Sequence, residues 1–83
     1  MIRVLFFAKL REDLGVRQLE ITPEGIATIH DLVLAAASKL GGDSLQQLSS
    51  PQLVISRNHE VTRRNAAVAD GDEIAFYPPV TGG

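Results

Sequence analysis

The chain ends in two glycines, and this ending is the part of the sequence best suited to chemistry. A carboxylate at Gly83 would stand on backbone without side chains, since Gly82 also lacks a Cβ. Such a segment adopts backbone angles closed to other residues and can pass through a channel too narrow for a Cβ. We therefore expect a carrier that presents its last carbonyl to the active site of another protein.

The chemistry of that carbonyl requires activation. A terminal carboxylate has a pKa of about 3.5, so at neutral pH it is ionised and is a poor acyl electrophile. The simplest activated form is a mixed anhydride with AMP, made by another protein that binds ATP. A nucleophile can then attack the Gly83 carbonyl, where sulfide or a persulfide leads to a thiocarboxylate and a lysine gives an isopeptide bond. The alternative is that the two glycines are a frayed end of no consequence.

The prolines before the glycines would separate this tail from the folded domain. Pro78 and Pro79 lack N–H donors and have a fixed φ, so they end the preceding strand and stiffen the base of the tail. The sequence thus predicts a domain over residues 1–79 and a flexible C-terminal tail over residues 80–83.

Side chains elsewhere offer no recognisable active site. The chain has no cysteine, which excludes disulfides, thiolate metal sites and a cysteine nucleophile. His30 and His59 have no obvious nucleophile beside them and form a poor metal set. Asp70 and Asp72 flank a glycine, and we interpret them as a turn before the last strand. We expect no bound cofactor or metal and no catalysis by this chain alone.

The composition limits the classes of partner and the location that we expect for this chain. The 83 residues are enough for one domain, and a net charge of −2 argues against nucleic acid. No apolar run reaches the roughly 18 residues of a membrane span, and Arg3 interrupts the apolar N-terminus, which we interpret as a strand. Without a targeting signal, we expect a cytoplasmic protein. The basic residues Arg57, Arg63 and Arg64 form either a docking spot or a solvated surface.

Hydrophobic periodicity predicts an α+β domain with one main helix and about five strands. Thr28 is the expected N-cap of that helix, Asp31 completes a capping box, and Gly41 follows its end. A shorter helix is expected over residues 44–48, and a loop or a single helical turn over residues 9–14. The strands are expected over residues 2–8, 17–21, 53–57, near Val61 and over 73–77.

The arrangement of these elements follows from their apolar faces. The first and last strands are the most apolar, so we expect them to pair in parallel at the centre of a mixed sheet, as in a β-grasp fold. One helix covers only one face of that sheet. The other face would carry an apolar patch beside the base of the tail, a common mark of a partner surface, unless a loop or the 44–48 segment covers it. The residues expected in this patch are Leu5, Phe7, Val54, Val61, Ala75 and Tyr77.

Both ends of the chain resemble the small subunit of molybdopterin synthase, the MoaD family. The opening run Met1–Ala8 is followed by Arg11-Glu12, and the closing run Asp70–Gly83 matches the pattern D-G-D-E-[IV]-A-F-[FY]-P-P-V-[ST]-G-G. Thiamine-pathway carriers share the two glycines but lack this Pro-Pro-Val-Thr context. The middle of the chain is less distinctive, and Ser56-Arg57 stands where small apolar residues are more usual in the family.

The resemblance implies a ubiquitin-like β-grasp fold and a sulfur-carrier cycle. An E1-like activating enzyme would adenylate Gly83 with ATP, and a sulfurtransferase would convert it to a thiocarboxylate. Sulfur would then pass, in the large catalytic subunit, to cyclic pyranopterin monophosphate during molybdenum cofactor biosynthesis. The large subunit is a dimer in this family, which implies a heterotetramer. The residues implied for tail insertion are Pro78, Pro79, Val80, Thr81 and Gly82, and those for partner contact are Phe7, Val61 and Tyr77.

Two other functions remain open at this point. A related ubiquitin-like sulfur donor would serve tRNA thiolation or protein conjugation. A β-grasp interaction module with an inert tail would tolerate extra residues after Gly83.

Overall fold

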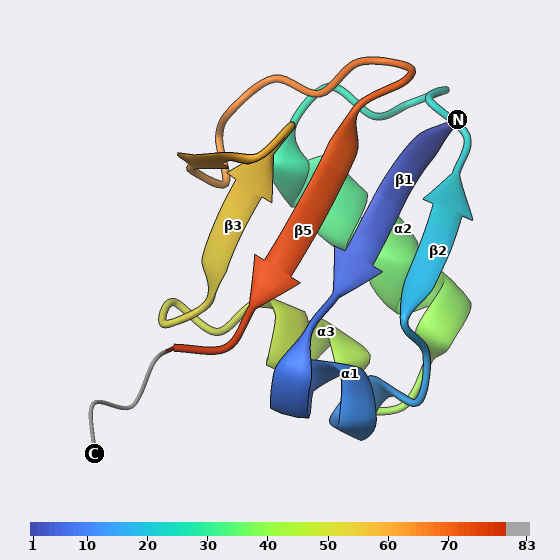
Figure 1. Ribbon diagram of the computed structural model, residues 1–83. Helices are drawn as coiled ribbons and strands as arrows, with labels where there is room; N and C mark the ends of the chain where they lie inside the picture. Colours follow the sequence, from blue (N-terminus) through green and yellow to red (C-terminus); the bar gives the residue numbers. More distant parts are fainter. Residues whose placement is uncertain (80–83) are drawn as a thin grey trace.

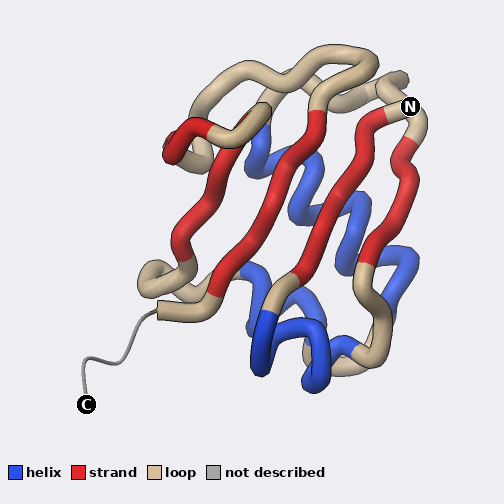
Figure 2. Tube along the Cα trace, viewed as in Figure 1, coloured by secondary structure: helices blue, strands red, loops and turns tan. Residues whose placement is uncertain are grey.

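The computed structural model describes residues 1–79, which form a five-stranded mixed sheet with the long helix α2 on one face (Figure 1). Figure 2 shows that the sheet face turned toward the viewer is crossed by no helix of the described residues. The strands are β1 Ile2–Phe6, β2 Gln18–Ile21, β3 Val54–Arg57, β4 Glu60–Thr62 and β5 Glu73–Tyr77. The helices are α1 Ala8–Leu14, α2 Ile29–Leu40 and α3 Ser44–Leu48.

The strand order confirms the predicted topology. The order is β2-β1-β5-β3-β4, with β1 and β5 parallel at the centre and antiparallel pairing elsewhere. Val4 lies opposite Ile74 and Phe6 opposite Phe76, so the apolar residues of the two central strands share one face. The strands at the two ends of the chain therefore meet side by side, as a β-grasp fold requires.

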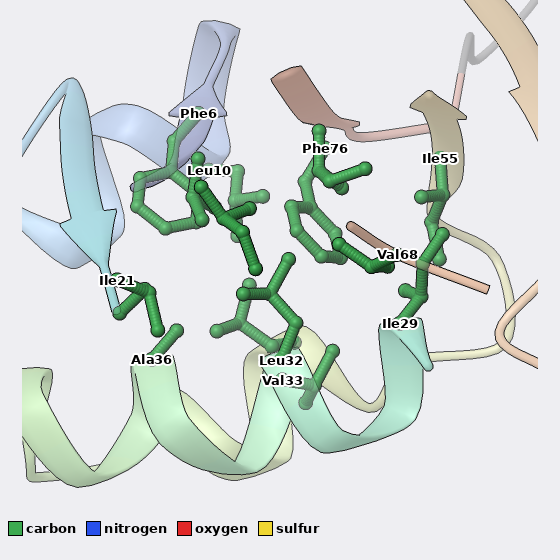
Figure 3. Packing of buried hydrophobic residues seen from close by; sticks show 14 residues of the cluster. Phe6, Leu10, Ile21, Ile29, Leu32, Val33, Ala36, Ile55, Val68 and Phe76 are labelled. Carbon is green, nitrogen blue, oxygen red and sulfur yellow. The ribbon is translucent and has the colours of Figure 1, made fainter. Parts of the chain in front are cut away.

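The hydrophobic core lies between this face and α2 (Figure 3). Phe6 and Phe76 are at most 1% exposed, and their ring centroids are 6.0 Å apart. They point toward Leu32 and Val33 of α2, which with Ile29 and Ala36 form the buried side of that helix. Removal of this apolar surface from water is the main stabilising contribution to folding.

The start of α2 confirms the predicted capping box. The Thr28 hydroxyl accepts the Asp31 N–H, and the Asp31 carboxylate accepts the Thr28 N–H at 3.1 Å. The N–H groups of Ala27 and Thr28 lower the pKa of Asp31, because both bonds favour its ionised form. The helix ends at Leu40 and is followed by Gly41, where φ is 70°.

Two local predictions need correction. Residues 9–14, expected as a loop or a single helical turn, belong to the seven-residue helix α1, which is longer than one turn because Leu10 is 5% exposed and anchors that segment in the core. The first strand ends at Phe6 and not at residue 8, since the backbone turns at Ala8 with φ 55°. Gly15 takes the left-handed conformation expected after this segment, with φ 79°.

The turn between β3 and β4 was predicted correctly. Asn58 and His59 both have positive φ, 51° and 73°, and connect the two strands as a two-residue hairpin turn. Among residues 1–79, no helix is long and apolar enough to cross a membrane.

Candidate functional site

The sheet face opposite α2 carries exposed apolar side chains at one end. We call Leu5, Phe7, Val54, Val61 and Tyr77 the uncovered-face patch. Phe7 is 37% exposed, Val54 38% and Val61 78%, while Leu5 and Tyr77 are half-buried. Neither a loop nor α3 buries these side chains, so the expected partner surface is accessible within the described residues.

Strand register places the patch in two adjacent rows. One row runs across four strands, from Leu5 through Ala75 and Ser56 to Val61. In the next row Val54 lies opposite Tyr77. Cross-strand partners project from the same side of a sheet, so the patch spans β1, β5, β3 and β4.

Ala75 was expected in this exposed patch, and that prediction is wrong. It lies on the uncovered face but is only 3% exposed, and Ser56 beside it is 6% exposed. Both side chains are short. In the row they lie between two larger side chains, Leu5 on β1 and Val61 on β4. The middle of the row is therefore lower than the larger apolar side chains at its two ends.

Phe7 and Tyr77 form an aromatic stack. Their ring centroids are 4.8 Å apart and the ring planes differ by 7°. Phe7 follows β1 in extended conformation and donates its N–H to the Phe76 carbonyl at 3.2 Å, and the turn at Ala8 then takes the chain into α1. Stacked pairs of this kind contribute about 0.5–1.5 kcal/mol beyond the area they bury. The stack holds Tyr77 at the point where the chain leaves the sheet.

The tail begins directly after this stack. Pro78 is half-buried and Pro79 exposed, and both follow the last residue of β5. Val80, Thr81, Gly82 and Gly83 lie outside the described residues. The reactive carbonyl and the insertion of the tail therefore stay predictions.

Asp72 has a structural role that the sequence did not reveal. It is 8% exposed and accepts bonds from Arg57 Nε at 2.8 Å, Asn58 Nδ2 at 3.0 Å and the Ala69 N–H at 2.8 Å. Burial raises the pKa of Asp72, but the bonds from Arg57, Ala69 and Asn58 outweigh it and the net pKa is lowered. Asp70, the other aspartate of the expected turn, pairs with the N-terminal ammonium group of Met1.

The expected basic spot is divided by internal contacts. Arg57 is bound to Asp72, and Arg64 Nη2 donates to the Ser50 carbonyl at 2.7 Å. Arg63 is exposed. The three residues therefore do not act as one free cationic surface.

The histidines lie apart from one another. His30 is exposed in the first turn of α2, while His59 lies in the β3–β4 turn, 3.5 Å from Glu73, which also pairs with Arg3 at 3.4 Å. Within residues 1–79, no three His, Asp or Glu side chains are grouped as metal ligands.

Comparison with known proteins identifies the family. The sequence model of the ThiS family matches residues 4–83. The chain belongs to the ThiS family. It is 39% identical over 83 residues to the molybdopterin synthase sulfur carrier subunit of Haemophilus influenzae and 36% identical over 83 residues to that of Escherichia coli, with 100% of each chain covered. These relatives confirm the resemblance carried by the two ends of the sequence.

Solved structures show the same fold. The crystal structure of SAMP1 from Haloferax volcanii superposes with a TM-score of 0.83 at 29% identity, covering 99% of this chain and 98% of that one. A protein–protein complex of subunits 1 and 2 of molybdopterin-converting factor from Helicobacter pylori contains a chain with a TM-score of 0.64 at 23% identity, covering 99% of this chain and 97% of that one. The ubiquitin-like β-grasp prediction is thereby confirmed.

Proposed function

We propose that this ThiS-family chain is the sulfur carrier subunit of a molybdopterin synthase. The observation that carries the proposal is the full-length match to sulfur carrier subunits, at 39% identity over 100% of both chains. The Gly83 carboxylate is the reacting group, and sulfur bound there is delivered for molybdenum cofactor biosynthesis. Residues 1–79 serve recognition, and residues 80–83 form the tail that carries the sulfur.

The proposed chemistry takes place on Gly83 and is catalysed by other proteins. The carboxylate attacks the α-phosphate of ATP bound to an E1-like activating enzyme, and pyrophosphate leaves. Sulfide-level sulfur supplied by a sulfurtransferase then attacks the acyl carbon, and AMP leaves to give the thiocarboxylate. This sulfur passes to cyclic pyranopterin monophosphate in the large subunit. ATP is thus a substrate of the activating enzyme and not a cofactor held by this chain.

The uncovered-face patch is the proposed docking surface for the large subunit. Phe7 and Tyr77 stack at the base of the tail, and Val61 is 78% exposed on the same face. A partner that covers this patch receives the tail from Pro78 onward in a defined direction. The Helicobacter pylori neighbour, which is described as a complex of two molybdopterin-converting factor subunits, supports an assembly of this type.

A second candidate function is sulfur donation to tRNA or conjugation to proteins. It is favoured by the likeness to small archaeal modifier protein 1, which is 33% identical over 84 residues. This function requires the same activated Gly83 but a different acceptor. It would produce isopeptide adducts on target lysines or make thiouridine levels dependent on this chain.

The deciding experiment is intact mass spectrometry of the protein incubated with the activating enzyme, ATP and a sulfur source. A mass gain equal to replacing one oxygen by sulfur, localised to Gly83 and absent without ATP, is the expected result. A variant with two residues added after Gly83 is the matched control and should gain no mass. An unchanged mass with an active enzyme would favour an inert interaction module instead. Adding the large subunit and pterin precursor then separates cofactor synthesis from the second candidate.

A further inference from the structure

Asp72 connects segments that are distant in the sequence. Its carboxylate accepts from Arg57 at the end of β3, from Asn58 in the β3–β4 turn and from Ala69 in the loop before β5. Because Asp72 is 8% exposed and accepts three partly buried hydrogen bonds, loss of its charge weakens all three. One side chain thus joins the β3–β4 hairpin to the start of β5.

A second set of bonds fastens the same turn. Asn58 donates its N–H to the Glu73 carbonyl at 2.8 Å, and the Asn58 side-chain oxygen accepts the Glu73 N–H at 2.9 Å. Asn58 and His59 both have positive φ, a conformation that asparagine and histidine adopt more often than other non-glycine residues but that still costs energy relative to glycine. The turn conformation therefore depends on the contacts that Asp72 and Glu73 supply.

This turn determines where Val61 stands. β4 has three residues and, among residues 1–79, pairs with β3 alone at the edge of the sheet. Val61 is 78% exposed and lies opposite Ser56, so its own packing does little to hold it in place. The geometry of the hairpin must place Val61 at the end of the uncovered-face patch.

Arg57 can be changed without altering the patch directly. Its register partner in β5 is Ile74, a core residue, so Arg57 projects from the face opposite the patch. The ion pair with Asp72 therefore fastens the hairpin from the side of the sheet away from the patch.

We propose that Asp72 and Arg57 are positioning residues for partner recognition, which hold the β3–β4 hairpin so that Val61 completes the uncovered-face patch. Neither side chain contacts the partner in this arrangement. The inference rests on the proposed function, because the recognised partner is the large subunit of molybdopterin synthase.

The test measures the affinity of the full chain for the purified large subunit by calorimetry. Asp72→Asn and Arg57→Val should each weaken binding by about fivefold to tenfold, and the double variant should be no weaker than the worse single variant. Arg63→Gln is the matched control, since Arg63 is exposed and makes none of these bonds, and should bind within about twofold of the original chain.

A coupling measurement separates positioning from general destabilisation. Circular dichroism first establishes that each variant is folded at the temperature of the assay. Val61→Ala should then weaken binding of the original chain more than it weakens binding of Asp72→Asn, because a displaced Val61 has less contact to lose. Arg57→Val serves this comparison if Asp72→Asn does not fold.

The outcomes distinguish the two proposals. Unchanged affinity of folded Asp72→Asn and Arg57→Val, with normal binding by the original chain, would overturn the positioning role alone. Equal effects of Val61→Ala in both backgrounds would also overturn it. Failure of the original chain to bind the large subunit would overturn the proposed function and this inference together.

Discussion

Both faces of β1 and β5 carry apolar side chains, but these are buried to different extents. On the face toward α2, Val4, Phe6 and Phe76 are at most 1% exposed. On the other face, Phe7 is 37% exposed and Tyr77 is half-buried. The same alternation along two strands has therefore produced one face that forms the core and one that remains accessible.

This difference separates side chains that stabilise the fold from those available to a partner. Burial of apolar area contributes to folding roughly in proportion to the area removed from water. The exposed part of the uncovered-face patch contributes little to the stability of the free chain, but it would contribute to the free energy of binding when a partner docks. The comparison thus supports a recognition role for the uncovered face without requiring a catalytic side chain.

The largest expected effect comes from the covered face. Phe76→Ala should lower the free energy of unfolding by about 3–5 kcal/mol, because it removes a fully buried ring from between the sheet and α2. Urea denaturation followed by circular dichroism measures the change. Since whole domains are stable by about 5–15 kcal/mol, this variant should be close to unfolding. A loss no greater than that of Tyr77→Ala would break the distinction between the two faces.

On the uncovered face, a substitution should affect partner binding more than stability. Tyr77→Ala should lower the free energy of unfolding by about 1 kcal/mol through the lost stack on Phe7, yet weaken large-subunit binding by on the order of 2 kcal/mol. Calorimetry and urea denaturation of the same sample give both values. Leu34→Ala is the control, since Leu34 is 47% exposed on α2, behind the sheet, and should leave the affinity unchanged. A stability loss with unchanged affinity would assign the patch to folding only.

The helix that covers one face depends on its cap. Thr28→Ala should lower the free energy of unfolding by about 1 kcal/mol, because it removes the acceptor for the Asp31 N–H. Thermal unfolding measures the loss of stability, and Thr28→Ser should retain most of the original stability. Large-subunit affinity of the folded variant should not change. A change in affinity would mean that the covered and uncovered faces are coupled through α2.

Acid should weaken the fold through two carboxyl groups. Backbone N–H groups lower the pKa of Asp31, and for Asp72 burial is outweighed by the bonds from Arg57 and its neighbours, so its pKa is also lowered. A folded pKa below the unfolded value means that this stabilisation is present above about pH 4 and is lost as pH falls through the depressed values. Urea denaturation at several pH values should show that the free energy of unfolding falls less with acid in Asp72→Asn than in the original chain. An unchanged pH profile would contradict the assignment, and Asp43→Asn is an exposed control.

The smallest effect is expected from surface charge on the uncovered face. Arg3→Gln removes an exposed pair with Glu73 and should change the free energy of unfolding by less than about 0.5 kcal/mol. Any effect should shrink further in high salt, because exposed charges are screened. A loss above about 1 kcal/mol in chemical denaturation would show that charge, in addition to the core, stabilises the sheet.

Predictions for the two central strands, for the start of α2 and for the β3–β4 turn depended on nearby residues and were confirmed. The alternation over β1 and β5 placed Phe6 and Phe76 inward, and the Thr28 capping box needed only residues within one helical turn. The Asn58-His59 turn was likewise visible in two consecutive residues. The family was evident because its pattern is continuous at each end of the chain.

Contacts between distant residues needed the tertiary structure. Phe7 stacks on Tyr77 across 70 positions, and Arg57 binds Asp72 across 15, because β5 lies between β1 and β3. The spacing of apolar residues along the chain carries no information about which strands become neighbours or how large the surrounding side chains are. The sequence by itself therefore determined the family, the alternation of the strands and the cap of the helix. Only the folded sheet decided that Ala75 is buried, that 9–14 is helical and that Asp72 fastens the hairpin carrying Val61.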